Sequence, residues 1–151
     1  MVARRPVACA CWEVTGSRDV ELLLAQARKE NPSLVVQAFT AAVEPNLAAV
    51  EMVAAQTLAA RDTGTTLAER PELDLLLRLA GTRQIGQALQ STGYKARGRR
   101  LFLVAAGRRA ADFARLKRMA RLGGFREVPR SALSAADLES VERAALLSAK
   151  A

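Results

Sequence analysis

Histidine is absent from this chain, and cysteine occurs only as Cys9 and Cys11. Without an imidazole, neither histidine acid–base catalysis nor a Ser-His or Cys-His nucleophile pair can be assembled. Two thiols alone do not complete a tetrahedral zinc site, so we expect no bound metal and no cofactor. Alternate residues of a strand point to one face, and there we expect both thiols to pack as small apolar side chains.

Long apolar runs and phosphate-binding loops are missing as well. No apolar run approaches the roughly 20 residues that a membrane-spanning helix needs, and no GxxxxGK[ST] loop occurs. The basic start, residues 1–6, lacks a signal-peptide cleavage pattern, which favours a cytoplasmic protein without membrane contact. Carboxylates such as Glu72 and Asp74 diverge on a helix and suit its positive end better than acid–base chemistry. We therefore expect no catalytic residues and no enzymatic activity of the chain alone.

Acidic residues are scarce in one part of the chain. Residues 95–130 carry 12 basic and 2 acidic side chains, a net charge of +10, whereas the remainder carries 11 basic and 13 acidic ones, a net charge of −2. Such segregation favours a contact surface for a polyanion, and nucleic acid is the leading candidate. The segment 109–122 predicts a basic amphipathic helix, whose charges either contact nucleic acid or form a solvated face.

The length and the hydrophobic pattern predict one domain that covers residues 1–151. Short segments that are apolar on both faces predict covered strands, and amphipathic segments between them predict helices. This order indicates an α/β fold, a single compact domain with a mixed β-sheet packed with helices. The predicted strands are 7–14, 34–38 and 101–106, and the predicted helices are 19–29, 45–60, 71–80, 82–93, 109–122 and one that follows Ser134.

Residues 68–85 hold the most specific local pattern, two helices around a glycine corner. Pro71 suits the first turn of a helix, and Gly81 suits the left-handed residue that ends it. Thr82 is expected to cap the second helix, which places Arg83 and Gln84 in its first turn. A cation there opposes the helix dipole, so a phosphate or carboxylate bound at this end would account for Arg83.

A longer pattern surrounds this corner and consists of an Ala-rich helix, a turn, an acidic-apolar helix and the corner itself. Its residues are Ala54, Ala55, Ala59, Thr66, Leu67, Ala68, the helix 72–79, Gly81, Thr82, Arg83, Gln84, Ile85 and Ala88. In this order they resemble the smallest accessory subunit of the KEOPS complex, including its archaeal members. In animals this family is known as the binding partner of the p53-related protein kinase. The resemblance covers residues 37–106 and is strongest over residues 67–89, while beyond Gly107 only the length and order of elements correspond.

The resemblance implies a nonenzymatic subunit with a compact α/β fold. Such a subunit docks on the small atypical kinase of KEOPS, an ATPase. It also grips the single-stranded 3′ CCA end of tRNA while another subunit makes threonylcarbamoyladenosine beside the anticodon. Arginines bind phosphates and stack on splayed bases, so we predict that Arg83, Gln84, Arg70 and Arg78 bind RNA. For Arg78 the alternative is an ion pair with Asp74, four residues earlier.

The same corner also fits a helix-turn-helix that reads duplex DNA through Gln84, Gln87 and Gln90. The flanking strands and the lack of a dimerisation element favour the RNA-binding subunit over this alternative. An apolar patch for the kinase would come from the Ala-rich helix or from a stripe of Leu75 and Leu79, which neighbouring elements can equally bury. Which face meets the kinase, and whether a weak homodimer forms, stay open.

Overall fold

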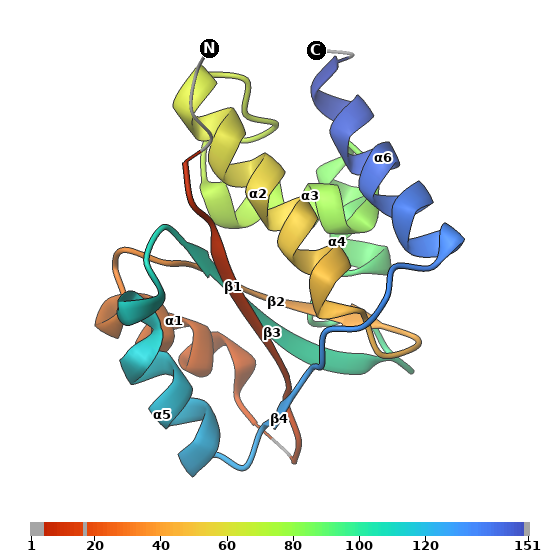
Figure 1. The fold of residues 1–151 in the computed structure, drawn as a ribbon. Coiled ribbons are helices and arrows are strands. Elements are labelled where there is room, and N and C mark those ends of the chain that lie inside the picture. Colours follow the sequence, from red (N-terminus) through yellow and green to blue (C-terminus); the bar gives the residue numbers. More distant parts are fainter. Residues whose placement is uncertain (1–4, 17, 150–151) are drawn as a thin grey trace.

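A four-stranded sheet forms the centre of the computed structural model, which describes residues 5–16 and 18–149 (Figure 1). Its strand order is β2-β3-β1-β4. The predicted α/β class is confirmed, because helices cover both faces of this sheet and form one compact domain with it. The strands are β1 (Ala8–Glu13), β2 (Val35–Ala41), β3 (Arg100–Gly107) and β4 (Arg126–Glu127).

The strand directions differ from the mixed sheet that the sequence predicted. Each pairing between the described strands is antiparallel. β3 inserts between β1 and β2, so these two strands never pair, although both run opposite to β3. Without the three helices between β2 and β3, the order β1-α1-β2-β3-α5-β4 is the β-α-β-β-α-β ferredoxin-like motif.

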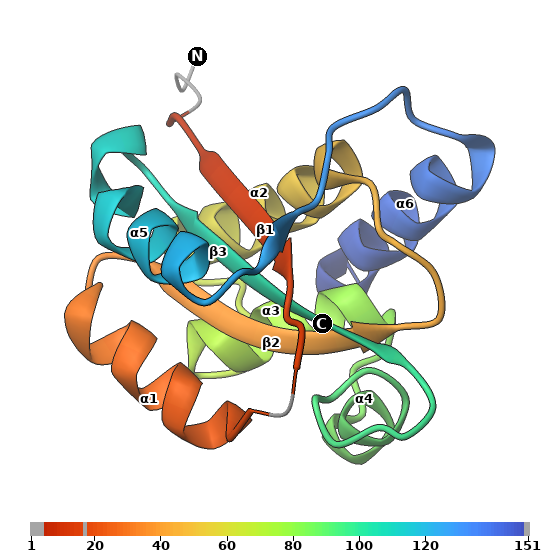
Figure 2. The ribbon, with the colours of Figure 1, turned by 90° about the horizontal axis from the view of Figure 1, so that it is seen from below.

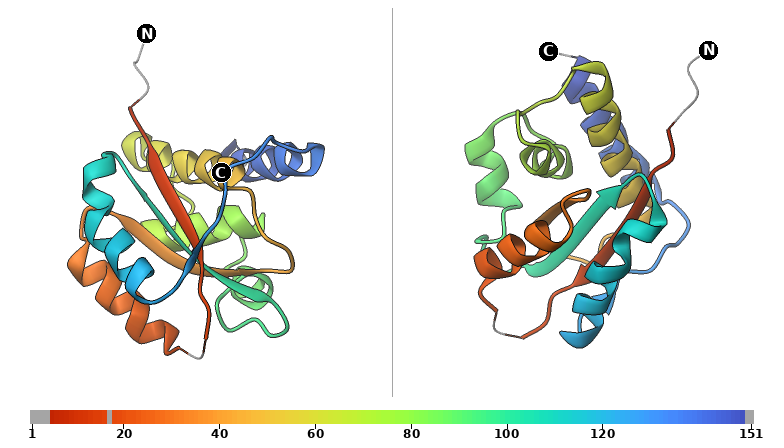
Figure 3. Two further views of the ribbon diagram at one scale, coloured as in Figure 1. Left: turned by 60° about the horizontal axis from the view of Figure 1, so that its bottom comes forward. Right: turned by 90° about the vertical axis from the view of Figure 1, so that its left-hand side faces the viewer.

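The helices form two layers on opposite sides of the sheet (Figures 2 and 3). Helices α1 and α5 cover one face, while α2, α3 and α6 cover the other, with α4 beside α3. The view from the left-hand side in Figure 3 separates the two layers most clearly. The helices are α1 (Val20–Glu30), α2 (Leu47–Thr63), α3 (Pro71–Ala80), α4 (Ile85–Ser91), α5 (Ala114–Leu122) and α6 (Ala135–Ala149).

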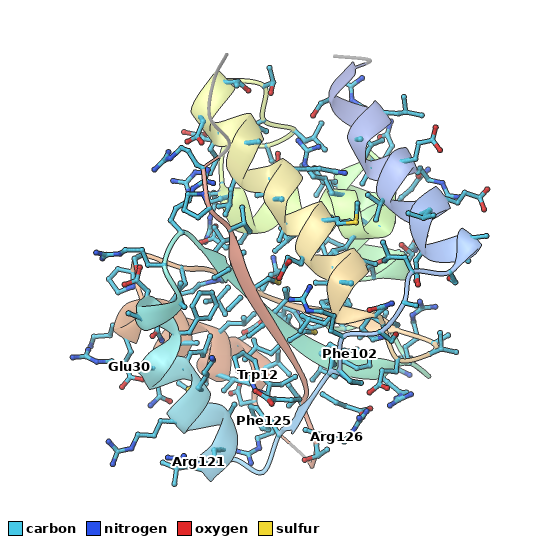
Figure 4. All side chains as sticks on the ribbon, in the orientation of Figure 1. Trp12, Glu30, Phe102, Arg121, Phe125 and Arg126 are labelled. Atoms are coloured by element: carbon cyan, nitrogen blue, oxygen red, sulfur yellow. The ribbon has the colours of Figure 1, made fainter. Side chains whose placement is uncertain are left out.

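Each layer has its own apolar core, which explains why the strands are apolar on both faces. Trp12 and Phe125 pack in the core beneath α1 and α5, whereas Phe102 belongs to the core beneath α2, α3 and α6 (Figure 4). Cys9 and Cys11 both pack against this second core, as their alternate spacing predicted. Burial raises the pKa of the Cys9 thiol to about 12, so it stays protonated near neutral pH.

Local signals place several helix ends correctly. α3 ends at Gly81, whose φ of 72° is left-handed. α6 begins with a capping box, in which the Ser134 N–H donates to Asp137 Oδ2 at 2.9 Å and the Asp137 N–H donates to Ser134 Oγ at 3.1 Å. The helix expected over 109–122 begins instead with a 3-10 turn, Ala110–Phe113, and continues as α5.

The outer edge of β2 is covered by side chains and a loop. Arg28 Nε donates to the Val36 carbonyl at 3.0 Å, and the Ala38 N–H donates to the Gln37 side chain at 2.9 Å. Further along, the Thr40 N–H donates to the carbonyl of the loop residue Thr92 at 2.8 Å. These bonds occupy three backbone groups that an edge strand would otherwise present unpaired.

Candidate functional site

The glycine corner between α3 and α4 is fixed by the backbone and by α6. The Gly81 N–H donates to the carbonyls of Leu77 and Arg78, and its positive φ closes the turn. A Cβ at this position would lie 2.9 Å from Cδ of Arg143, which reaches over from α6. The left-handed conformation favours glycine at this corner, and a larger side chain there would also have to displace the flexible Arg143 side chain.

Thr82 shapes the segment between the corner and α4, but not as the expected helix cap. Its hydroxyl accepts a hydrogen bond from the Gln84 N–H and donates one to the Gln87 side chain, both at 3.1 Å. α4 begins only at Ile85, with Gln84 at the N-cap position. Arg83 therefore precedes the helix instead of lying in its first turn, and the argument from the helix dipole does not apply to it.

Arg83 and Gln84 are both exposed, and Gln84 lines an open hollow between α4 and the loop that follows it. We call this the α4 hollow; its volume is about 740 Å³. Three side-chain amides and two cations surround it, together with the half-exposed Leu89. Its lining residues are Gln84, Gly86, Gln87, Leu89, Gln90, Lys95, Ala96 and Arg97.

Arg70 lies outside the α4 hollow. Its side chain is largely exposed at the start of α3, with Nε 3.9 Å from a carboxylate oxygen of Glu72. It lines a second pocket of about 300 Å³, to which Arg28 and Tyr94 also contribute. Leu89 lines both cavities, so this second pocket adjoins the α4 hollow. The structure thus brings Arg70 near Gln84 but on the other side of Leu89.

RNA binding would require an exposed side chain, but Arg78 is buried. Its side chain is only 1% exposed, and its Nε donates to Asp74 Oδ1 at 2.7 Å. It also donates to Ser148 Oγ at 2.8 Å and to the Ala144 carbonyl at 3.3 Å, both on α6. The alternative interpretation, an ion pair with Asp74, is therefore correct, and Arg78 joins α3 to α6 inside the protein.

Ion pairs neutralise half of the basic side chains in residues 95–130. Those with a carboxylate partner are Lys95, Arg100, Arg108, Arg109, Arg126 and Arg130. Within residues 5–16 and 18–149, no carboxylate lies within ion-pairing distance of the other basic side chains in this segment: Arg97, Arg99, Arg115, Lys117, Arg118 and Arg121. The positive charge thus concentrates beside α4 and on α5.

Sequence reasoning did not place three contributors at this site. It counted Lys95 and Arg97 only within the basic segment 95–130, although their place shortly after α4 was a signal that the chain returns past that helix. It also missed Arg143, because nothing in the sequence indicates that α6 reaches the glycine corner. Such a contact follows only from the packing of distant segments.

An apolar groove runs along the outer side of α2, between the start of the chain and α6. Its volume is about 750 Å³, and Val7, Met52, Ala55, Ala59 and Val141 supply its apolar lining. By contrast, Leu75 from the other proposed apolar stripe is fully buried beneath the chain's own elements. The stripe therefore offers no apolar surface at Leu75, and α2 carries the better candidate for a docking surface.

Among the described residues, the side chains of His, Cys, Asp and Glu form no group of three or more that could hold a metal ion. No helix within that part of the chain is both long and apolar enough to cross a membrane. Neither a scan against protein-family models nor a search of curated proteins found a match.

Proposed function

We propose that this protein is a nonenzymatic subunit of a KEOPS assembly that binds the single-stranded 3′ CCA end of tRNA. The observation that carries the proposal is the α4 hollow, which combines the amides of Gln84, Gln87 and Gln90 with the cations Lys95 and Arg97. Amides can donate to and accept from base edges, and cations bind phosphates. In this proposal the protein recruits tRNA, and another subunit makes threonylcarbamoyladenosine.

The shape of the hollow favours a single strand over a duplex. α4 has seven residues and is therefore about 10 Å long. Such a short helix is poorly suited to act as a recognition helix in the major groove of a duplex. The hollow is shallow and open, and the half-exposed side chain of Leu89 in its lining offers apolar contact to unstacked bases. Single-stranded ends can splay their bases into such a site, whereas paired bases cannot. The helix-turn-helix alternative therefore has less support.

We assign the tail contact to Arg83, Gln84 and Arg70, and no longer to Arg78. Arg83 and Gln84 are exposed just before α4, where Gln84 lines the α4 hollow, and Arg70 lies in the adjoining pocket. A tail that passes over Leu89 would meet the cations of both cavities. This path fits an end of a few nucleotides whose phosphates and bases are contacted in turn.

Titration of fluorescent tRNA and of a copy trimmed of CCA tests this function. We expect the trimmed tRNA to bind roughly tenfold more weakly or worse, since it lacks the bases that the hollow contacts. Arg83→Ala should weaken binding of intact tRNA, whereas Arg61→Ala removes the same charge at the end of α2 and should not. Equal binding of intact and trimmed tRNA would overturn the assignment, and preference for a specific DNA duplex would favour the helix-turn-helix alternative.

The groove on α2 is the surface that we propose for the kinase subunit. Small side chains such as Ala55 and Ala59 allow a partner helix to approach the backbone of α2 closely. Ala59→Glu places a charge in this groove and should abolish pull-down of the kinase subunit. The matched control, Ala114→Glu, lies on the exposed start of α5 and should leave pull-down intact. Undiminished pull-down by Ala59→Glu would exclude this groove.

A further inference from the structure

Helix α5 presents a basic face that the proposed tail site does not use. Leu116 and Ala120 bury the inner side of α5 against the sheet, and this fixes which side chains point outward. Figure 4 shows Arg121 at the C-terminal end of this helix, far from Phe102. The α5 basic face consists of four exposed side chains, Arg115, Lys117, Arg118 and Arg121.

The charges of this face are not compensated within the described residues. No carboxylate there lies within ion-pairing distance of the four side chains, and Asp112, three residues before Arg115, pairs with Arg109 at 3.3 Å. Arg115, Arg118 and Arg121 follow one another about 4.5 Å apart along the helix axis. Four like charges so close together repel one another, and a bound polyanion would relieve that repulsion.

The chemistry of the face separates three kinds of polyanionic partner. A membrane surface would need a free apolar side of the helix, but Leu116 and Ala120 are buried in the core, and Leu122 is the one large apolar side chain that α5 exposes among the described residues. Sequence-independent binding of a single strand gains much of its affinity from bases that stack on aromatic side chains, and the outward side chains of α5 include none. The phosphate backbone of a double helix needs only exposed cations on a convex surface, and this is what α5 offers.

We propose that the α5 basic face binds the phosphate backbone of double-helical RNA without reading its sequence. The choice of RNA over DNA rests on the proposed tRNA function. α5 and α4 lie in opposite layers of the protein, so this contact is separate from the tail site (Figure 3). The tail and a double-helical segment would therefore contact different parts of the surface.

The test measures binding of the full chain to a blunt RNA duplex of about 16 base pairs. This probe has no single-stranded end, so a failure of the tail site does not affect it. Arg115→Gln/Arg118→Gln removes two cations from the face. We expect the affinity of this variant for the duplex to fall by roughly tenfold or more at about 0.1 M salt. The log–log slope of its affinity against salt concentration should be less steep by about 2.

A charge-matched control separates a local contact from a general charge effect. Arg5→Gln/Arg61→Gln removes two positive charges next to α2, in the opposite layer, and should leave duplex binding close to that of the wild type. Equal losses in both variants, or no binding to the blunt duplex even at about 0.05 M salt, would overturn the proposal. So would tighter binding to an equally long DNA duplex or to phosphatidylserine vesicles than to the RNA duplex.

Discussion

Glu13 forms ion pairs with two arginines, Arg100 and Arg126. It accepts hydrogen bonds from Arg100 at 2.7 and 2.9 Å and from Arg126 at 2.9 Å. The hydrogen bonds from Arg100, which have the larger effect, and from Arg126 lower its pKa from 4.5 to about 2. The group thus joins the ends of three strands, because Glu13 lies on β1, Arg100 on β3 and Arg126 on β4.

This lowered pKa predicts how stability depends on pH. A carboxyl group with a depressed folded-state pKa contributes stability above its unfolded pKa and loses it as the pH falls through the folded value. We therefore expect the free energy of unfolding to fall as the pH drops from about 4.5 to about 2. Glu13→Gln should flatten this part of the curve, whereas the exposed Glu139→Gln should not. Urea unfolding at several pH values measures this free energy. If it depended on pH equally in both variants, Glu13 would not be the group responsible.

Single residues were predictable from the sequence where the cause is local. Gly81 follows from the backbone conformation that a helix end requires, and the Ser134–Asp137 capping box follows from spacing alone. The role of Arg78 was not decided by the sequence, because an arginine four residues after Asp74 suits both an exposed and a buried pair. Burial depends on where α6 packs, and no local pattern reports that.

At the scale of elements, the Asp74–Arg78 pair connects three segments. Asp74 also accepts the Leu67 N–H at 2.7 Å, while Arg78 reaches α6 through Ser148 and Ala144. The pair therefore ties the turn after α2 and the helix α6 to α3. Because both charged groups are buried, each depends on the other for compensation.

Removal of one partner should be costly. Arg78→Leu leaves the Asp74 carboxylate buried without its cation, and we expect the free energy of unfolding to fall by about 3 to 5 kcal/mol. The exposed Arg70→Leu, on the same helix, should change it by less than about 1 kcal/mol. Urea unfolding followed by circular dichroism measures both. A loss below about 1 kcal/mol for Arg78→Leu would show that the pair does not hold the elements together.

Helices and long strands were predicted to within a few residues, but pairing was not. Periodicity reports which residues of a segment are buried, and so it identified β1, β2 and β3. It does not report which strand lies next to which, and the insertion of β3 between β1 and β2 gave the all-antiparallel sheet. β4 has only two residues, Arg126 and Glu127, and so has no detectable pattern.

At the scale of the whole molecule, the positive charge divides between two places that the sequence could not separate. In the sequence, residues 95–130 form one basic region. The fold, however, places Arg97 beside α4 and Arg118 in the opposite layer. The glycine corner was predicted as the candidate site because its pattern is local. The shape of the α4 hollow depends on the return of the chain after α4, so it emerged only from the fold.

The covered outer edge of β2 has a consequence for how the protein associates. The Val36 carbonyl and the N–H groups of Ala38 and Thr40 are already hydrogen-bonded within the chain. A second copy, or an extended peptide, would first have to displace Arg28 and the loop at Thr92 before it could add a strand there. A strand added along β2 would therefore gain fewer new backbone hydrogen bonds than one added to an unoccupied sheet edge.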